Sequence, residues 1–314
     1  MTDGPAFYFP DVPPIPLPAG HRFPAGKYGM LRAAIERAGT LARATLVPSP
    51  IAAREDLLRA HADGYVDAML DGNVTPDAMR RIGLPWSETL VLRSRATVGG
   101  AIASARSALE HGISGQLAGG THHAHTDFGS GFCVFNDLAV AARTLIETGR
   151  VARLAIVDTD VHQGDGTAAI LGGDERIFLL SIQGERNFPF RRVPSTLDVE
   201  LADGTRDDDY LAALAPALDR VLAHRPDIVF FLSGADPLKE DRLGRLDLTH
   251  EGLARRDALV LGACKDHGIP VSIAIGGGYA EPIEASVRGY LGTFEVASRL
   301  YGLGLSDRPY RNER

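Results

Sequence analysis

Residues 154–166 read LAIVDTDVHQGDG, a short apolar run followed at once by acidic and histidine side chains. The first part, Leu154–Asp158, is apolar without alternation, which predicts a strand buried on both faces of a parallel sheet. Ligands bind beyond the carboxyl ends of such strands, so chemistry is expected in the polar residues that follow. This stretch therefore predicts both an α/β fold and the position of its site.

The alternation of apolar runs with helical periodicity continues from about residue 113 onward, as expected of strand–helix units. Further strands are predicted at Gln116–Ala118, Ile177–Ile182, Ile228–Leu232 and Pro270–Ile275. Helices, in which apolar residues recur at three- and four-residue steps, are predicted at Glu88–Glu110, Leu138–Thr148, Asp208–His224, His250–His267 and Glu281–Tyr301. The pattern favours a single layered α/β domain over residues 1–314, with helices on both faces of the sheet.

Two regions depart from this pattern. The first hundred residues carry many Pro and Gly, around residues 10–29 and 72–86, and are expected to be loops framing two or three helices. The segment from Gly184 to Asp209 has no sustained period and is longer than an ordinary connection, so we expect a functional loop there.

Composition limits the class of protein. The 314 residues are 45% hydrophobic, enough for a large core, and the net charge of −7 with scattered Lys and Arg argues against direct binding of nucleic acid. Residues 1–24 lack a signal-peptide pattern, and no apolar run approaches the roughly 20 residues that span a bilayer. We therefore expect a cytoplasmic protein without membrane contact; the sequence does not predict its oligomeric state.

Two cysteines occur, Cys133 and Cys264. They are too few for a disulfide framework or a cysteine-based zinc site, so any metal must use histidine and carboxylate ligands. Cys133 has no recognisable activating neighbours and is expected to be a buried, small apolar residue.

Such ligands occur in the opening stretch, where Asp158, Asp160 and His162 alternate by two and would share one face of an extended chain. Asp160 and His162 could ligate one ion, and Asp236, after another predicted strand, could complete the set. Three protein ligands leave one position open for water, as in catalytic zinc sites. The alternative is that these carboxylates cap the next helix, which explains one aspartate more readily than the whole group.

His122 and His123 follow the predicted strand at 116–118. A carboxylate hydrogen bonded to one ring nitrogen fixes the tautomer and raises the basicity of the other, and Asp158 and Asp165 are two available partners. One histidine near a strand end is more often an ordinary polar residue. Two in succession favour a pair of His–Asp dyads.

Tyr279 follows three glycines after the last predicted strand. Gly277 and Gly278 would let the backbone pass close to a ligand, leaving the phenol at the rim of the site, where it could polarise a carbonyl. A turn with a packed tyrosine, or a loop that cradles phosphate, would give the same four residues. His21 and His125 are expected to be loop residues without a role.

Five blocks of the chain, in this order, resemble the signatures of the histone deacetylase family within the arginase and deacetylase superfamily: Gly119–Ala124, Gly131–Asp137, Val157–Gly166, Gly234–Asp236 and Gly276–Tyr279. The class IV branch and its bacterial relatives are resembled most, through HRFP at 21–24, KY at 27–28 and DRLGRL at 241–246. The resemblance implies a three-layer α/β/α domain with a mainly parallel eight-stranded sheet.

The resemblance also implies a reaction, the hydrolysis of acyl-lysine amides. Asp160, His162 and Asp236 would bind Zn²⁺, or Fe²⁺ in its place, and an activated water would be the nucleophile. Tyr279 would donate a hydrogen bond to the oxygen on which charge develops.

The two histidines have different implied roles. His123, backed by Asp165, would take the proton of the water and later protonate the leaving amine. His122, backed by Asp158, would contribute mainly electrostatics.

Other positions matched to the family concern the substrate and a second ion. Phe132 and Phe188 would flank the acyl-lysine channel, in place of ordinary core packing, and the Gly131 carbonyl would accept the substrate N–H. A structural monovalent cation, expected to be K⁺, would be held in part by backbone carbonyls at Asp158, Asp160, His162 and Ser181.

The chain departs from the common family pattern at Thr159 and Gln163, which replace an aliphatic residue and a second histidine. No rim aspartate that would anchor a peptide backbone is identified, so small acylated amines such as acetylpolyamines are an alternative substrate. Two further interpretations are an arginase-like ureohydrolase with two metal ions and a non-catalytic binder of acylated ligands. Neither accounts for the single three-ligand set together with Tyr279.

Overall fold

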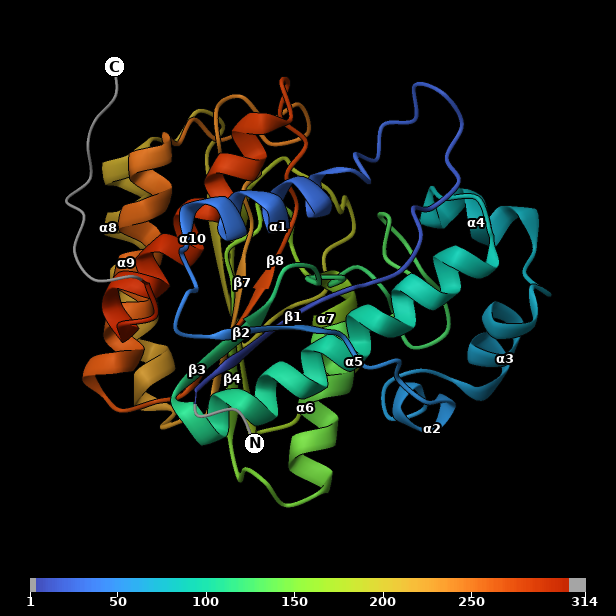
Figure 1. The fold of residues 1–314 in the computed structure, drawn as a ribbon, viewed down its shortest axis with the longest axis horizontal. Helices are drawn as coiled ribbons and strands as arrows, with labels where there is room; N and C mark the ends of the chain where they lie inside the picture. The colour runs from blue at the N-terminus through green and yellow to red at the C-terminus, as the bar shows by residue number, and fades with distance from the viewer. Residues whose placement is uncertain (1–3, 305–314) are drawn as a thin grey trace.

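The computed structural model describes residues 4–304. Its centre is one sheet of eight strands, all paired in parallel, in the order β2-β1-β3-β8-β7-β4-β5-β6 (Figure 1). The strands are β1 (Ala6–Phe9), β2 (Thr45–Pro48), β3 (Ile113–Gln116), β4 (Leu154–Asp158), β5 (Ile177–Gly184), β6 (Leu197–Leu201), β7 (Val229–Ser233) and β8 (Val271–Ile275). The predicted α/β architecture with an eight-stranded sheet is confirmed.

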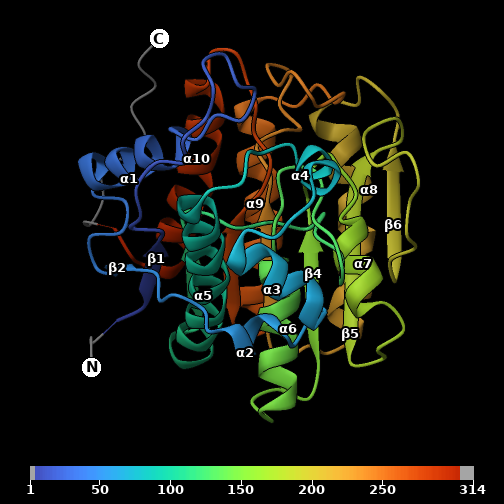
Figure 2. The same ribbon diagram turned by 90° about the vertical axis from the view of Figure 1, so that its right-hand side faces the viewer.

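Helices cover both faces of the sheet, which gives three layers (Figures 1 and 2). One layer contains α1 (Lys27–Ala38), α8 (Asp207–Ala223), α9 (His250–Asp266) and α10 (Glu284–Tyr301). The other contains α5 (Glu88–His111), α6 (Asp137–Glu147) and α7 (Asp165–Leu171), with the short helices α2 (Arg54–Leu57), α3 (Asp63–Asp71) and α4 (Pro76–Ile82) on the same side.

Alternate residues of the central strands enter two different hydrophobic clusters. In β7, Val229 and Phe231 pack toward the layer of α8, α9 and α10, whereas Phe230 and Leu232 pack toward the layer of α5 and α6. Every residue of β4, β7 and β8 is buried. Burying such a side chain stabilises the fold by roughly 1.5–3 kcal/mol, which explains why these strands are apolar throughout.

The amino-terminal prediction was wrong in part. Residues before α5 form two strands, β1 and β2, and four helices, where only loops and two or three helices were expected. Both strands are four residues long and lie in Pro-rich surroundings, so their sequences carry no clear strand pattern. Likewise, the expected loop from Gly184 to Asp209 contains β6, an edge strand.

The strand predicted at Gln116–Ala118 also lies elsewhere, since β3 begins at Ile113 and ends at Gln116. Ser114 and Gly115 concealed it, because neither residue favours a strand. The structure requires glycine at position 115: a Cβ there would lie 2.9 Å from Cβ of Ile273 on β8. The predicted helix start at Glu281 was also early, because α10 begins at Glu284.

The strand order brings the polar segments together. β3, β8, β7 and β4 are adjacent in the sheet, and the polar residues identified above follow the carboxyl ends of these four strands. The chain crosses from β3 over two strands to β4, the kind of switch point at which parallel sheets bind ligands. In the described part of the chain, no helix is long and apolar enough to cross a membrane.

Candidate active site

Asp160, His162 and Asp236 converge beyond the ends of β4 and β7. One ligand atom from each lies within 4.8 Å of the other two, and all three residues are buried. Nδ1 of His162 is 3.0 Å from Oδ1 of Asp160 and 3.1 Å from Oδ2 of Asp236. The structure therefore brings together the three residues predicted to ligate a metal.

Backbone amides fix the two carboxylates. The amide of Val161 donates to Oδ1 of Asp236 at 3.0 Å, the amide of His162 donates to Oδ1 of Asp160 at 2.9 Å, and the amide of Gly277 donates to the other oxygen of Asp160. Gly277 must lack a side chain, because a Cβ there would lie 1.9 Å from Oδ2 of Asp236. The glycine segment after β8 thus packs directly on the metal-ligating group.

The donor set fits a divalent cation. Two carboxylates and one imidazole are the nitrogen and oxygen ligands of catalytic zinc and iron sites. Burial and the neighbouring carboxylate of Asp160 raise the pKa of Asp236 to about 7. A bound cation would offset this repulsion between buried carboxylates.

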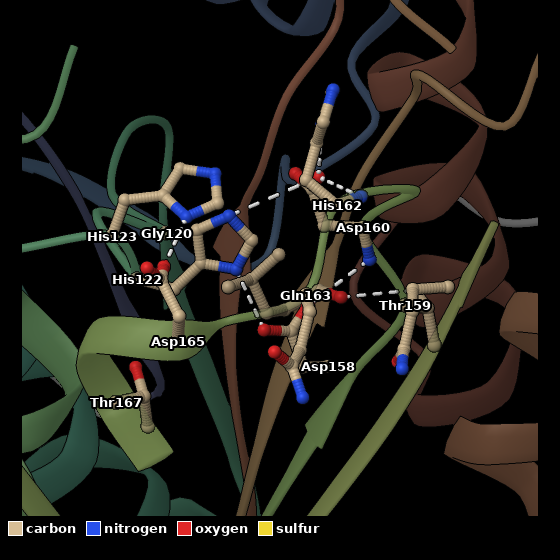
Figure 3. Close-up of polar contacts among 12 residues, drawn as sticks. Gly120, His122, His123, Asp158, Thr159, Asp160, His162, Gln163, Asp165 and Thr167 are labelled. Atoms are coloured by element: carbon tan, nitrogen blue, oxygen red, sulfur yellow. Dashed lines mark hydrogen bonds and ion pairs between the residues drawn. The ribbon is translucent and has the colours of Figure 1, made fainter. Parts of the chain in front are cut away.

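Both predicted His–Asp dyads are present (Figure 3). Nδ1 of His122 lies 2.7 Å from Oδ2 of Asp158, and Nδ1 of His123 lies 2.7 Å from Oδ1 of Asp165. The two imidazole centroids are 4.1 Å apart, and the His123 ring is 6.0 Å from the ring of His162. Both rings thus lie next to the metal-ligating group.

The two histidines differ in protonation. Burial disfavours the charged form of His122, but Asp158 and Asp160 outweigh it and raise its pKa to about 9. Burial and the charge of His122 lower the pKa of His123 to about 4, against the opposing effect of Asp165. A neutral His123 can accept a proton, whereas a charged His122 supplies positive potential.

His125, predicted to be a loop residue without a role, is in a loop but does have a polar partner. Its Nε2 lies 3.1 Å from Oδ2 of Asp165, so this carboxylate contacts two imidazoles. Both contacts help to hold the pKa of Asp165 well below its usual value, although its burial opposes this. The sequence contained the residue, but its spacing did not indicate the pairing.

Tyr279 lies beside the metal-ligating group on a loop that three distant side chains hold. Oδ2 of Asp241 accepts from the Tyr279 amide at 2.6 Å. Lys27, only 2% exposed, donates to the Gly278 carbonyl at 3.1 Å and to the Tyr290 hydroxyl at 2.9 Å. Tyr290 in turn donates to the Gly276 carbonyl at 3.0 Å. Burial raises the pKa of Tyr279 well above its usual value, so its phenol stays protonated.

A cavity of about 820 Å³ is lined by these groups, including Asp160, His162, His122, His123 and Tyr279. Such a volume is typical of small-molecule sites. Phe132, Phe188 and Gly131 also line it, as predicted for a substrate channel; the Phe188 ring stands edge-on to His123 at 4.9 Å, and the Phe132 ring is 5.8 Å from that of Tyr279. The exposed ring of Phe190 extends this wall outward.

Gly278 does not line the cavity, although it was predicted to contact substrate. It faces α10 instead, because a Cβ at this position would lie 2.1 Å from the Tyr290 hydroxyl. Gly277 does line the cavity. The three glycines therefore serve close packing on both sides of the loop.

Ser181 is the strand partner of Asp158, on β5 beside β4, and is buried. The four residues predicted around a monovalent cation are thus neighbours in space. His21, also assigned to a loop, lies at the cavity with its ring 6.3 Å from that of Phe132.

Sequence reasoning missed further residues that support the site. Asp137 accepts from the amides of Gly120 and Thr121 and so holds the segment before the two histidines. Arg256, fully buried, donates to the Gly234 carbonyl at 2.6 Å, just before Asp236. Asp137, Asp241 and Lys27 stand in motifs quoted above, but only the fold reveals their partners.

Cys133 is buried, as predicted, and its Sγ lies 3.4 Å from the Gly131 carbonyl. Burial raises the pKa of its thiol, so it remains a neutral, unreactive group. Cys264 is likewise buried and unpaired.

Comparison with protein families matches residues 21–291 to the histone deacetylase domain. An uncharacterized protein of Picosynechococcus is 45% identical over 89% of this chain and 93% of its own length. Histone deacetylase 2 of Arabidopsis thaliana is 29% identical over 89% of this chain and 74% of its own. The crystal structure of the HDA15 HD domain, 20% identical, superimposes with a TM-score of 0.78 over 95% of this chain and 88% of that one, which supports the same fold.

Proposed function

The chain belongs to the histone deacetylase family, and we propose that it hydrolyses the side-chain amide of acylated lysine in proteins or peptides. One observation carries the proposal. Two residues of the buried metal-ligating group, Asp160 and His162, line one cavity together with a neutral imidazole backed by a carboxylate and a protonated phenol. These are the parts required to polarise an amide, activate water and stabilise a tetrahedral oxyanion.

Asp160, His162 and Asp236 would hold Zn²⁺, or Fe²⁺ in its place. When bound, such an ion would polarise the acyl carbonyl and lower the pKa of water at the site. The three side chains contribute two negative charges and one neutral imidazole, leaving room at the ion for water and substrate.

His123 would act as the general base and then as the general acid. Its Nδ1 is bound to Asp165, so Nε2 is free to take a proton from the attacking water and to pass one to the departing amine. The low pKa of His123 keeps it neutral before the reaction. Asp165 would stabilise the charged ring that forms.

His122 and Tyr279 would stabilise negative charge. His122, charged beside Asp158, would add positive potential without moving a proton. Tyr279 would donate its hydroxyl hydrogen to the developing oxyanion, and Asp241 and Lys27 would keep the loop that carries it in place.

A linear acyl-lysine chain would pass between Phe132 and Phe188 while its N–H donates to the Gly131 carbonyl. Small acetylated polyamines are the alternative, but the charge of the cavity disfavours them. Four cations without an ion pair among the described residues line it, Arg22, Arg81, Arg93 and Lys27, against the single carboxylate of Asp160; Arg186 and Arg245 also line it but are paired with Asp203. A polycation would be repelled.

A monovalent cation, K⁺, would occupy the space beside Asp158 and Ser181, with backbone carbonyls of Asp160 and His162 as further ligands. Its function would be structural, because it would bridge β4 and β5 directly behind the metal-ligating residues. The chain would form one catalytic domain.

Tyr279→Phe tests the proposal. Metal-loaded wild type and variant are compared on acetyl-lysine peptides, longer acyl-lysine peptides and an acetylated polyamine. Loss of an oxyanion donor should reduce kcat by at least tenfold, and by roughly 10²–10³ if the hydrogen bond is as strong as is typical, while KM changes little. Tyr301→Phe is the control, because its hydroxyl donates to the Leu261 carbonyl away from the cavity.

Each outcome separates one candidate function from another. Absence of turnover of every substrate by the metal-loaded protein would favour a non-catalytic binder. Two catalytic ions per chain, measured by elemental analysis, would favour an arginase-like reaction. Activity confined to the polyamine would show that the substrate class is wrong while the chemistry holds.

A further inference from the structure

One wall of the cavity has a basic side chain that the proposed reaction does not use. Leu90, Arg93, Ser94 and Thr97 on α5 all line the cavity. Leu90 and Thr97 are buried, whereas Arg93 is partly exposed within the opening. A helix whose other cavity residues are apolar or hydroxylic thus presents one cation to the space beside the reacting groups.

Arg93 has no acidic partner. Among residues 4–304 it forms no ion pair, and its guanidinium donates no hydrogen bond to another residue. Its one defined contact is with an aromatic ring: Cζ lies 4.0 Å from the centroid of Tyr28. Stacking fixes the plane of a guanidinium but leaves its N–H donors at the edges free. Because Arg93 lines the cavity, those donors are available to a ligand there.

Aromatic contacts link Arg93 to the reacting groups. Tyr28 also lies 5.3 Å from Nζ of Lys27, and Nζ of Lys27 lies 4.9 Å from the ring centroid of Tyr279. Arg93 is thus connected to the Tyr279 phenol through contacts with Tyr28 and Lys27. All four residues line the same cavity. Lys27 adds a second positive charge, also without a carboxylate partner in the described structure.

Two cations without carboxylate partners in a cavity favour an anion, and a guanidinium edge matches a carboxylate with two parallel hydrogen bonds. We propose that Arg93, assisted by the charge of Lys27, forms a carboxylate-binding subsite of the cavity. The proposal rests on acyl-amide hydrolysis as the function of the site. The carboxylate is the distal group of a dicarboxylic acyl chain on the substrate lysine, such as succinyl or glutaryl.

The test uses three full-length, metal-loaded proteins: wild type, Arg93→Gln and Arg93→Lys. Arg106→Gln is the matched control, because Arg106 is on the same helix, is exposed and does not line the cavity. Hydrolysis is measured on acetyl-, succinyl- and succinamoyl-lysine peptides, the last being a neutral copy of succinyl. Binding of free glutarate is measured by calorimetry.

If the subsite binds a dicarboxylic acyl chain, wild type should hydrolyse the succinyl-lysine peptide with a kcat/KM about tenfold higher than that of the succinamoyl-lysine peptide. A tenfold difference is the usual effect of one charge-assisted hydrogen bond. Arg93→Gln should abolish this preference, Arg93→Lys should retain part of it, and Arg106→Gln should retain it in full. In calorimetry, free glutarate should bind about tenfold more weakly to Arg93→Gln than to wild type and Arg106→Gln.

The proposal is overturned if wild type shows no preference for succinyl over succinamoyl, or if Arg93→Gln leaves both that preference and the affinity for glutarate unchanged. Binding of carboxylate to the metal alone would give that result, since it does not depend on Arg93. Failure of the proposed function is seen separately, as absence of turnover of every peptide by wild type. Calorimetry then still decides whether the carboxylate subsite exists.

Discussion

Single buried polar residues hold the candidate site, and His61 is an example that does not itself line the cavity. Its Nδ1 lies 2.9 Å from the His125 carbonyl, and the amide of Asn136 donates to its Nε2 at 2.9 Å. An Nε2 that accepts a hydrogen bond must be unprotonated, so Nδ1 carries the proton and the ring is neutral. His61 therefore links His125 and Asn136, which lie on either side of residues 126–135, only while its ring is neutral.

Acid should weaken the fold through His61. Burial lowers its pKa from 6.5 to about 4, so the unfolded chain binds its proton first as the pH falls. This contribution is fully present above pH 6.5 and lost between 6.5 and about 4, a total of about 3 kcal/mol at 1.36 kcal/mol for each pKa unit. Urea unfolding from pH 8 to 5 should show a steeper loss of stability for wild type than for His61→Gln. Parallel curves would contradict the assignment.

Lys27 is the other residue whose removal should have a defined cost. Lys27→Met leaves the Gly278 carbonyl and the Tyr290 hydroxyl without their donor, a loss of about 1–3 kcal/mol in the free energy of unfolding. Because the Tyr279 loop loses its support, kcat should fall more than KM changes. Lys239→Met, at an exposed lysine, is the control and should stay within about 0.5 kcal/mol of wild type. Equal effects of the two substitutions would refute the role.

The sequence indicated the residues whose side chains can ligate a metal ion or transfer a proton. Asp158, Asp160 and His162 are close in the chain and alternate, so their shared face could be inferred, and the structure brings Asp160 and His162 together with Asp236. Lys27 lies 251 residues from Gly278, and no local pattern connects them. Such a contact exists only once α1 and the segment after β8 have packed, so only the fold could reveal it.

At the scale of elements, hydrogen bonds at the start of α6 connect this helix to the segment that carries His122 and His123. Asn136 caps the helix, accepting from the Ala139 amide at 2.9 Å. Its Nδ2 also donates to the Ala124 carbonyl at 3.1 Å and to Thr167 at 3.0 Å, on the segments that carry the two histidines and Asp165. The helix was predicted within one residue at each end, but this second function of its cap was not.

Asn136→Ala should therefore cost more than an ordinary cap. Thr75→Ala, at the cap of the exposed helix α4, removes only the bond to the Ala78 amide and should cost about 1 kcal/mol. Asn136→Ala also leaves a buried carbonyl unpaired and should cost about 2–4 kcal/mol. Asn136→Ser, which can still cap, should recover about 1 kcal/mol. Chemical unfolding of the three variants checks this order; a smaller loss for Asn136→Ala than for Thr75→Ala would contradict it.

Elements were predicted best where both faces are buried. β4 agrees with its predicted bounds because an uninterrupted apolar run ends at an aspartate. β2 and β6 were missed because they form the two edges of the sheet, where half-buried residues include polar ones and Pro; β1 was missed because it is only four residues long and lies in Pro-rich sequence. Their pairing partners, rather than their own composition, make them strands.

Across the whole molecule, metal binding should contribute to stability. Two buried carboxylates face each other, and a ligand that binds only the folded chain stabilises it by about 2.7 kcal/mol at 100 times its Kd. Thermal unfolding should therefore shift upward by roughly 5 °C or more when Zn²⁺ or Fe²⁺ is restored to chelator-treated protein. Asp236→Asn should lose this shift without destabilising the metal-free protein, because it removes one of the repelling charges. An unchanged Tm in wild type would exclude a tight site.

The position of β8 has a consequence for the making of the protein. Among the described strands it is the last in the chain, yet it lies between β3 and β7 in the middle of the sheet. Until the ribosome has added residue 275, β2-β1-β3 and β7-β4-β5-β6 are two separate half-sheets, each with an open edge that invites mispairing. Tyr279 follows only four residues later. A nascent chain thus receives Tyr279, the proposed oxyanion donor, at the same stage of synthesis as the strand that joins its two half-sheets, and a chain terminated earlier lacks both.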